Sequence, residues 1–166
     1  MSGANARGDN GRGGRIPLVL DTDIGDDVDD AFALLLAAAE PSLDLVRVTT
    51  VYGDGQMRSR IARKMLDVAG RGDVPVLVGR GYTLSGRDVP PGARGNHLTS
   101  AAGYLQPQGS EEWRRLGERL DRRDAVDFIL ETIASRPGEV VLGAMGPLTN
   151  VAAAIRRLVH QVSFSL

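Results

Sequence analysis

The sequence predicts an α/β domain in which helices flank a largely parallel, Rossmann-like sheet. Two observations carry this prediction. Short apolar or β-branched runs, typical of buried strands, alternate along the chain with segments of helical periodicity. Glycine-containing turns follow three of these strands, as at the ligand-binding edge of a parallel sheet. With 166 residues, 42% of them hydrophobic and 25% charged, the chain suffices for one globular domain.

The first predicted strand is preceded by a segment with no predicted secondary structure. Residues 1–15 contain five Gly, three Arg and no large apolar residue after Met1, which predicts a disordered leader, and residues 16–166 then form the domain. No apolar h-region follows, as a secretory signal requires, so we expect a cytoplasmic protein. The apolar run 16–20 predicts a buried strand. Residues 29–40 are apolar almost all round and predict a buried helix opened by two acids.

The middle of the chain continues the alternation. Residues 43–51 are rich in β-branched side chains and predict a second strand, and residues 57–68 have the apolar spacing of an amphipathic helix. Basic residues stand between the apolar positions of this helix, and we expect them to form a solvated face: Arg58, Arg60, Arg63 and Lys64. Residues 74–78 predict a third strand, and residues 79–110 are rich in loop-forming residues.

The last part of the chain predicts two helices around a fourth strand. Apolar residues at helical spacing predict a helix over 126–133, and 139–142 predicts the strand. Gly146-Pro147 then opens a helix that extends to Leu158. The remaining residues, 159–166, are either the start of a fifth strand or an unrelated ending.

Composition excludes several classes of function. The net charge of −1 argues against nucleic acid or an anionic membrane as a partner, and no apolar run approaches the roughly 20 residues that span a bilayer. The absence of cysteine excludes disulfides, thiolate nucleophiles and thiolate metal sites. Only two histidines are present, His97 and His160, so a multi-histidine metal site is excluded as well.

An acidic cluster follows the first predicted strand. Six of the ten residues in the segment 21–30 are aspartate: Asp21, Asp23, Asp26, Asp27, Asp29 and Asp30. Two like charges about 4 Å apart repel by roughly 4 kcal/mol at a protein surface. We therefore expect a bound hard cation, for which calcium and magnesium are candidates, or carboxylates that share protons. The alternative is a solvated acidic loop at a helix N-terminus.

Three motifs carry a resemblance to a known family. The stretches LVLDTDIGDDVDDAFALLLA, TTVYGDG and GAMGPLTNVAAAI resemble, in order, the N-terminal motifs of the inosine–uridine-preferring nucleoside hydrolases, over about residues 16–158. The resemblance implies an N-glycosidase that hydrolyses purine or pyrimidine ribonucleosides to ribose and free base with one bound calcium ion. Such chemistry fits the residues, because a cation and a carboxylate together activate water against an oxocarbenium-like transition state.

The resemblance also assigns roles to residues. It implies that Asp23 ligates calcium and takes the proton of the attacking water, that Asp30 is a second ligand and that the Met145 carbonyl is a third. The resemblance further implies that Asp29 accepts a hydrogen bond from a ribose hydroxyl and that Asp54 lies near the ribose and the water.

The remaining aspartates of the acidic cluster have no single assigned role. Asp21 is expected behind the ligands rather than among them. This sequence also has two residues more than the common family spacing between the glycine and the aspartate pair, so Asp26–Asp27 competes with Asp29–Asp30 for the ligand and ribose roles.

The family domain continues beyond the last of these motifs, with further ribose ligands, a histidine near the leaving base and a final calcium ligand. We therefore expect an incomplete domain, truncated at the C-terminus, and low activity. Two other functions are considered: an Asp-nucleophile phosphatase of the haloacid-dehalogenase type, built on Asp21-Thr22-Asp23, and a non-catalytic calcium-binding fragment. A homo-oligomer is compatible with each.

Overall fold

The computed structural model describes residues 14–25, 27–82, 84 and 110–163. The prediction of a disordered leader falls almost wholly outside these residues, and so do Asp26 and His97.

The described strands form one parallel sheet, as the sequence predicted. Its strands are β1 (Ile16–Thr22), β2 (Leu43–Thr50), β3 (Val76–Leu77) and β4 (Val141–Ala144), in the order β3-β2-β1-β4. Because all four run in the same direction, the turns that follow them emerge at one edge of the sheet.

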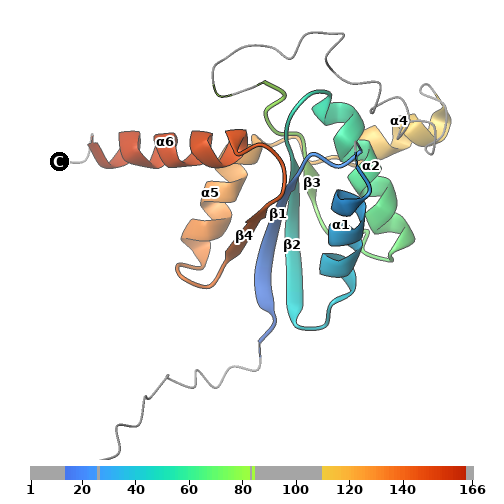
Figure 1. The fold of residues 1–166 in the computed structure, drawn as a ribbon, viewed down its shortest axis with the longest axis horizontal. Coiled ribbons are helices and arrows are strands. Elements are labelled where there is room, and N and C mark those ends of the chain that lie inside the picture. Colours follow the sequence, from blue (N-terminus) through green and yellow to red (C-terminus); the bar gives the residue numbers. More distant parts are fainter. Residues whose placement is uncertain (1–13, 26, 83, 85–109, 164–166) are drawn as a thin grey trace, which may run out of the picture.

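Helices cover both faces of the sheet, with α1 and α2 on one side and α5 and α6 on the other (Figure 1). Their bounds are α1 Asp29–Ala39, α2 Gly55–Val68, α4 Glu111–Glu118, α5 Ala125–Ser135 and α6 Thr149–Ser163. One apolar cluster packs between the sheet and α1 with α2, and a smaller one packs beneath α5 and α6. The fold class is therefore confirmed.

Two segments differ from the sequence prediction. The described chain continues α6 to Ser163, so residues 159–163 extend a helix and do not begin a fifth strand. The short helix α4 was not predicted. Its first turn is capped by Ser110, whose side chain accepts a hydrogen bond from the Trp113 amide at 3.1 Å.

The expected solvated basic face of α2 is wrong for two of its four residues. The side chain of Arg58 is fully buried and that of Arg63 is 2% exposed. Both donate hydrogen bonds to backbone carbonyls of neighbouring turns, which meets the requirement that a buried cation be fully hydrogen-bonded. Lys64 is half-buried and pairs with Glu112 of α4, so a second helix lies against this face.

The prediction that α1 is buried all round is also wrong. Leu34, Ala37 and Ala38 face the core, but the side chains of Phe32 and Leu36 are 66% and 65% exposed. A helix beside a sheet buries one stripe, and an apolar sequence on its outer face does not create a second contact.

Among the described helices, none combines the length and apolar character that a bilayer crossing requires.

Candidate functional site

The turns after β1, β2 and β4 lie side by side at the carboxyl edge of the sheet. The Val51 amide donates to the Thr22 carbonyl at 3.1 Å, and the Met145 amide donates to the Asp21 carbonyl at 2.8 Å. These bonds continue the sheet pairing past the strand ends. The turns that carry Asp23 and Met145 therefore start from neighbouring positions.

The carboxylate of Asp23 lies against the turn after β4. A Cβ atom on Gly146 would come within 2.8 Å of Asp23 Oδ1 and within 2.7 Å of Val51 Cγ1. Only a residue without a side chain fits there, which explains the glycine that follows Met145. Asp23 and the Met145 turn, which the sequence analysis placed in one site, are thus brought together.

Thr22 joins the end of β1 to the start of α1. Its hydroxyl donates a hydrogen bond to Asp30 Oδ1 and accepts one from the Ile24 amide at 3.1 Å. Asp30 is buried as a result, whereas Asp27 and Asp29 are exposed. Asp30 is therefore fixed beside the turn of Asp23.

The carboxyl group of Asp21 lies beneath the edge and is fully buried. Its Oδ1 accepts hydrogen bonds from Thr49 Oγ1 at 2.6 Å and from Asn150 Nδ2 at 2.8 Å, while its Oδ2 has no partner among the described residues. Burial raises the pKa of Asp21 from 3.8 to about 6; the two hydrogen bonds oppose that rise and the charge of Asp23 adds to it. Asp21 thus lies behind the edge, and its expected place behind metal ligands stays a prediction.

Asn150 holds the site together, a role that was not predicted although the residue belongs to the third family motif. Its Nδ2 also donates to the Thr50 carbonyl at 2.9 Å, and its Oδ1 accepts from the Arg80 amide at 2.9 Å. The side chain is fully buried and connects α6 with β1, β2 and the segment after β3. The sequence signal for this role was an asparagine placed just after the fourth predicted strand, in the stretch Gly-Pro-Leu-Thr-Asn. A side-chain amide that becomes buried at such a position needs hydrogen-bond partners.

Asp54 has a structural role that is independent of any substrate. It is exposed and stands at the N-cap of α2, where Oδ1 accepts a hydrogen bond from the Met57 amide at 3.0 Å. Its expected place near a ribose stays a prediction, as does the ribose contact of Asp29.

The six-aspartate cluster does not gather as a group in the described part of the chain. No three acidic or histidine side chains there lie close enough together to hold a metal ion. Asp21 is hydrogen-bonded to Thr49 and Asn150, and Asp30 to Thr22, whereas Asp29 is exposed in the first turn of α1. The candidate metal ligands at this edge, the Asp23 and Asp30 carboxylates and the Met145 carbonyl, all offer oxygen atoms, which hard cations prefer. They fit part of a calcium shell, which takes 6–8 ligands.

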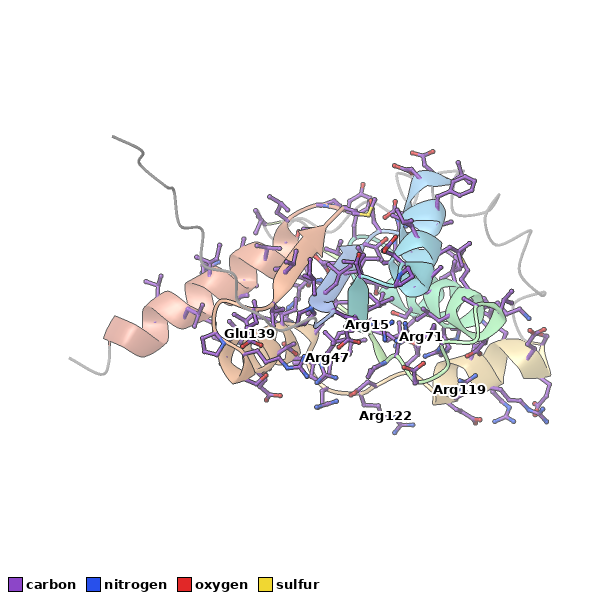
Figure 2. The ribbon with its side chains drawn as sticks, turned by 90° about the horizontal axis from the view of Figure 1, so that it is seen from below. Arg15, Arg47, Arg71, Arg119, Arg122 and Glu139 are labelled. Atoms are coloured by element: carbon purple, nitrogen blue, oxygen red, sulfur yellow. The ribbon has the colours of Figure 1, made fainter. Side chains whose placement is uncertain are left out.

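A separate cavity of about 270 Å³ lies at the opposite, amino-terminal edge of the sheet. Figure 2 views this edge, where Arg47 and Arg71 are labelled. Arg71 is paired with Asp73, and Arg47 stacks on the Phe128 ring at 3.7 Å and bonds Thr132. Its arginines thus have structural partners, and the cavity contains none of the site residues predicted from sequence.

Comparison with known proteins identifies relatives both in sequence and in structure. The chain is 36% identical to uridine nucleosidase 1 of Arabidopsis thaliana over 84% of its own length and 40% of the relative's. It is 34% identical to the inosine-uridine preferring nucleoside hydrolase of Leishmania major over 87% and 45%, respectively. The structure of a plant nucleoside hydrolase superposes with a TM-score of 0.65 at 32% identity, covering 85% of this chain and 42% of that one.

The chain therefore spans less than half the length of the curated relatives it matches. Within it, the sequence model of the inosine-uridine preferring nucleoside hydrolases matches residues 18–162, which include β1 and nearly all of α6. The motifs at the carboxyl edge, the parallel sheet and this match agree, and the chain belongs to the inosine-uridine preferring nucleoside hydrolase family.

Proposed function

We propose that this chain provides the water-activating part of a calcium-assisted site that hydrolyses the N-glycosidic bond of ribonucleosides, releasing ribose and a free base. One observation carries the proposal: the Asp23 carboxylate is packed against the Met145–Gly146 turn beside the buried Asp30. This contact places the Asp23 carboxylate against a turn more than 120 residues further along the chain, at the edge where parallel sheets bind ligands, and so supports the proposal.

In the proposed mechanism, Asp23 takes a proton from the attacking water, because its carboxylate is half-buried and lies against the turn after β4. Asp29, exposed in the first turn of α1, accepts a hydrogen bond from a ribose hydroxyl. Asp23, Asp30 and the Met145 carbonyl would hold the calcium ion. When bound, that ion supplies positive charge that lowers the pKa of water and orients the sugar diol.

The hydrogen-bond network beneath the edge supports this assignment. Asn150 and Thr49 hold Asp21 in place, and the Asp21 carbonyl holds the Met145 amide. The proposed donors are therefore mounted on rigid sheet backbone, which a site that must position a water within a fraction of an ångström requires.

The test is base release from inosine and uridine by the purified chain with calcium, followed by ultraviolet absorbance and reducing-sugar formation. We expect calcium-dependent release above that of Asp23→Ala, at a low rate. A proton-transfer group contributes roughly 10²–10⁴-fold, so even slow turnover leaves a measurable difference.

The same assay separates the other functions considered. Calcium binding in a titration without any base release would favour the non-catalytic fragment over the enzyme. Release of phosphate from an aryl phosphate would favour the Asp-nucleophile phosphatase, which family membership argues against. Equal base release by the wild type and Asp23→Ala would refute the proposal.

A further inference from the structure

Arg58 is a buried cation that contacts the backbone of the proposed site. It lies in the first turns of α2, and its side chain is fully buried. A guanidinium group in that environment loses its hydration, so its N–H groups need protein acceptors. The acceptors found are backbone carbonyls of the two turns that follow β1 and β2.

The first of these acceptors is in the turn of Asp23. Nη1 of Arg58 donates to the Asp23 carbonyl, and also to the Ile24 carbonyl at 3.0 Å. Gly25 follows with a φ of 115°, so the chain leaves the strand direction at this point. Arg58 therefore holds the backbone from which the Asp23 carboxylate extends.

The second acceptor is in the turn after β2. Nε of Arg58 donates to the Tyr52 carbonyl at 2.6 Å, and the guanidinium carbon lies 5.9 Å from the centre of the Tyr52 ring. Tyr52 has a φ of 67°, a left-handed conformation that non-glycine residues seldom adopt. One side chain thus links two turns that lie far apart in the sequence, one after β1 and one after β2.

We propose that Arg58 is a positioning residue, which acts through the backbone of Asp23 and Tyr52 to set the Asp23 carboxylate at the calcium and water site. The importance of this for catalysis rests on the proposed function, whereas the link between the two turns does not. Lysine cannot replace Arg58, because an ammonium group on a flexible stem lacks the planar fork that reaches both turns at once.

Arg63 is a matched control within the same helix. Its side chain is 2% exposed, and it likewise donates to backbone carbonyls, those of Val74 at 2.6 Å and Arg71 at 2.9 Å. These acceptors belong to the turn before β3, at the opposite edge of the sheet from Asp23. Arg63 also pairs with Asp67 of the same helix, through Nε at 3.1 Å. Arg63→Lys therefore removes a buried guanidinium fork from the same helix without touching the proposed site.

The experiment compares Arg58→Lys with Arg63→Lys and the wild-type chain by amide hydrogen exchange and by calorimetric titration with calcium chloride. We expect Arg58→Lys to speed exchange at Ile24 and Gly25 at least tenfold and to weaken calcium binding at least tenfold. Arg63→Lys should speed exchange near Val74 and leave calcium affinity within twofold. Equal effects of both variants on exchange at Ile24 and Gly25 and on calcium affinity would overturn the proposal.

Two further arms keep the result interpretable. If Arg58→Lys does not fold, both lysine variants are compared in a Tyr52→Gly background, since glycine adopts the left-handed conformation freely. If the wild type binds no calcium, the proposed function fails while the exchange comparison still decides whether Arg58 fixes the Asp23 turn. Unchanged exchange at Ile24 in Arg58→Lys overturns the inference whatever the calcium result.

Discussion

Replacing Asn150 with aspartate is a sharp test of the network beneath the site. The two side chains have nearly the same shape, and the substitution keeps the acceptor for the Arg80 amide. It removes both hydrogen bonds that Nδ2 donates, to Asp21 Oδ1 at 2.8 Å and to the Thr50 carbonyl at 2.9 Å. It also brings a second carboxylate against the buried Asp21 carboxylate, whose Oδ2 has no hydrogen-bond partner within the described part of the chain.

The magnitude follows from these contacts. Leaving a buried acceptor unsatisfied costs roughly 1–3 kcal/mol, and two acceptors are affected, so Asn150→Asp should lower the free energy of unfolding by about 2–6 kcal/mol at pH 8. At lower pH the two carboxyl groups share a proton, which restores one hydrogen bond. The folded state then binds more protons than the unfolded state, so the penalty shrinks as the pH falls.

The assay is urea unfolding at pH 5 and pH 8 with a chelator present, using Asn150→Ala as the uncharged control. Asn150→Ala should show a smaller pH dependence, because it adds no titrating group and changes only the pKa of Asp21, which loses one of its hydrogen bonds. A penalty below about 1 kcal/mol for Asn150→Asp at pH 8, or the same pH dependence in both variants, would show that Asn150 does not hold Asp21 as described.

Three further predictions concern Asp21, Gly146 and Asp54. Because the folded-state pKa of Asp21 is raised to about 6, the free energy of unfolding should fall as the pH rises from about 4 to about 6, by up to roughly 1.4 kcal/mol per pH unit; urea titrations of Asp21→Asn should lack that component. Gly146→Ala should weaken calcium binding in a calorimetric titration, since its Cβ meets Asp23 Oδ1 at 2.8 Å, whereas Gly143→Ala, with its nearest atom at 3.5 Å, should leave the affinity unchanged. Asp54→Ala should lower the free energy of unfolding by about 1 kcal/mol in thermal unfolding, because it removes the N-cap of α2, and Asp54→Ser should recover most of that loss. Lower base release by Asp54→Ser than by the wild type would then reveal a ribose role distinct from capping.

The buried arginines of α2 show where sequence reasoning reaches its limit. An amphipathic pattern identifies a helix and its apolar stripe, and the helix is present as predicted. The same pattern marks Arg58 and Arg63 as surface residues, because charge normally indicates solvent. Their burial depends on carbonyls in turns distant in sequence, which only the folded chain brings within reach.

By itself, the sequence determined the α/β class, the parallel strands and the family, because strand and helix periodicities and motif spacing are local properties of the chain. The positions of the turns after β1, β2 and β4 at one edge also followed from the sequence, since the ends of parallel strands share an edge. Only the tertiary structure decided which aspartates are buried, which side chains hold the turns and which face of α1 is exposed. These outcomes depend on hydrogen bonds and packing between residues far apart in the chain, and no local pattern encodes such pairings.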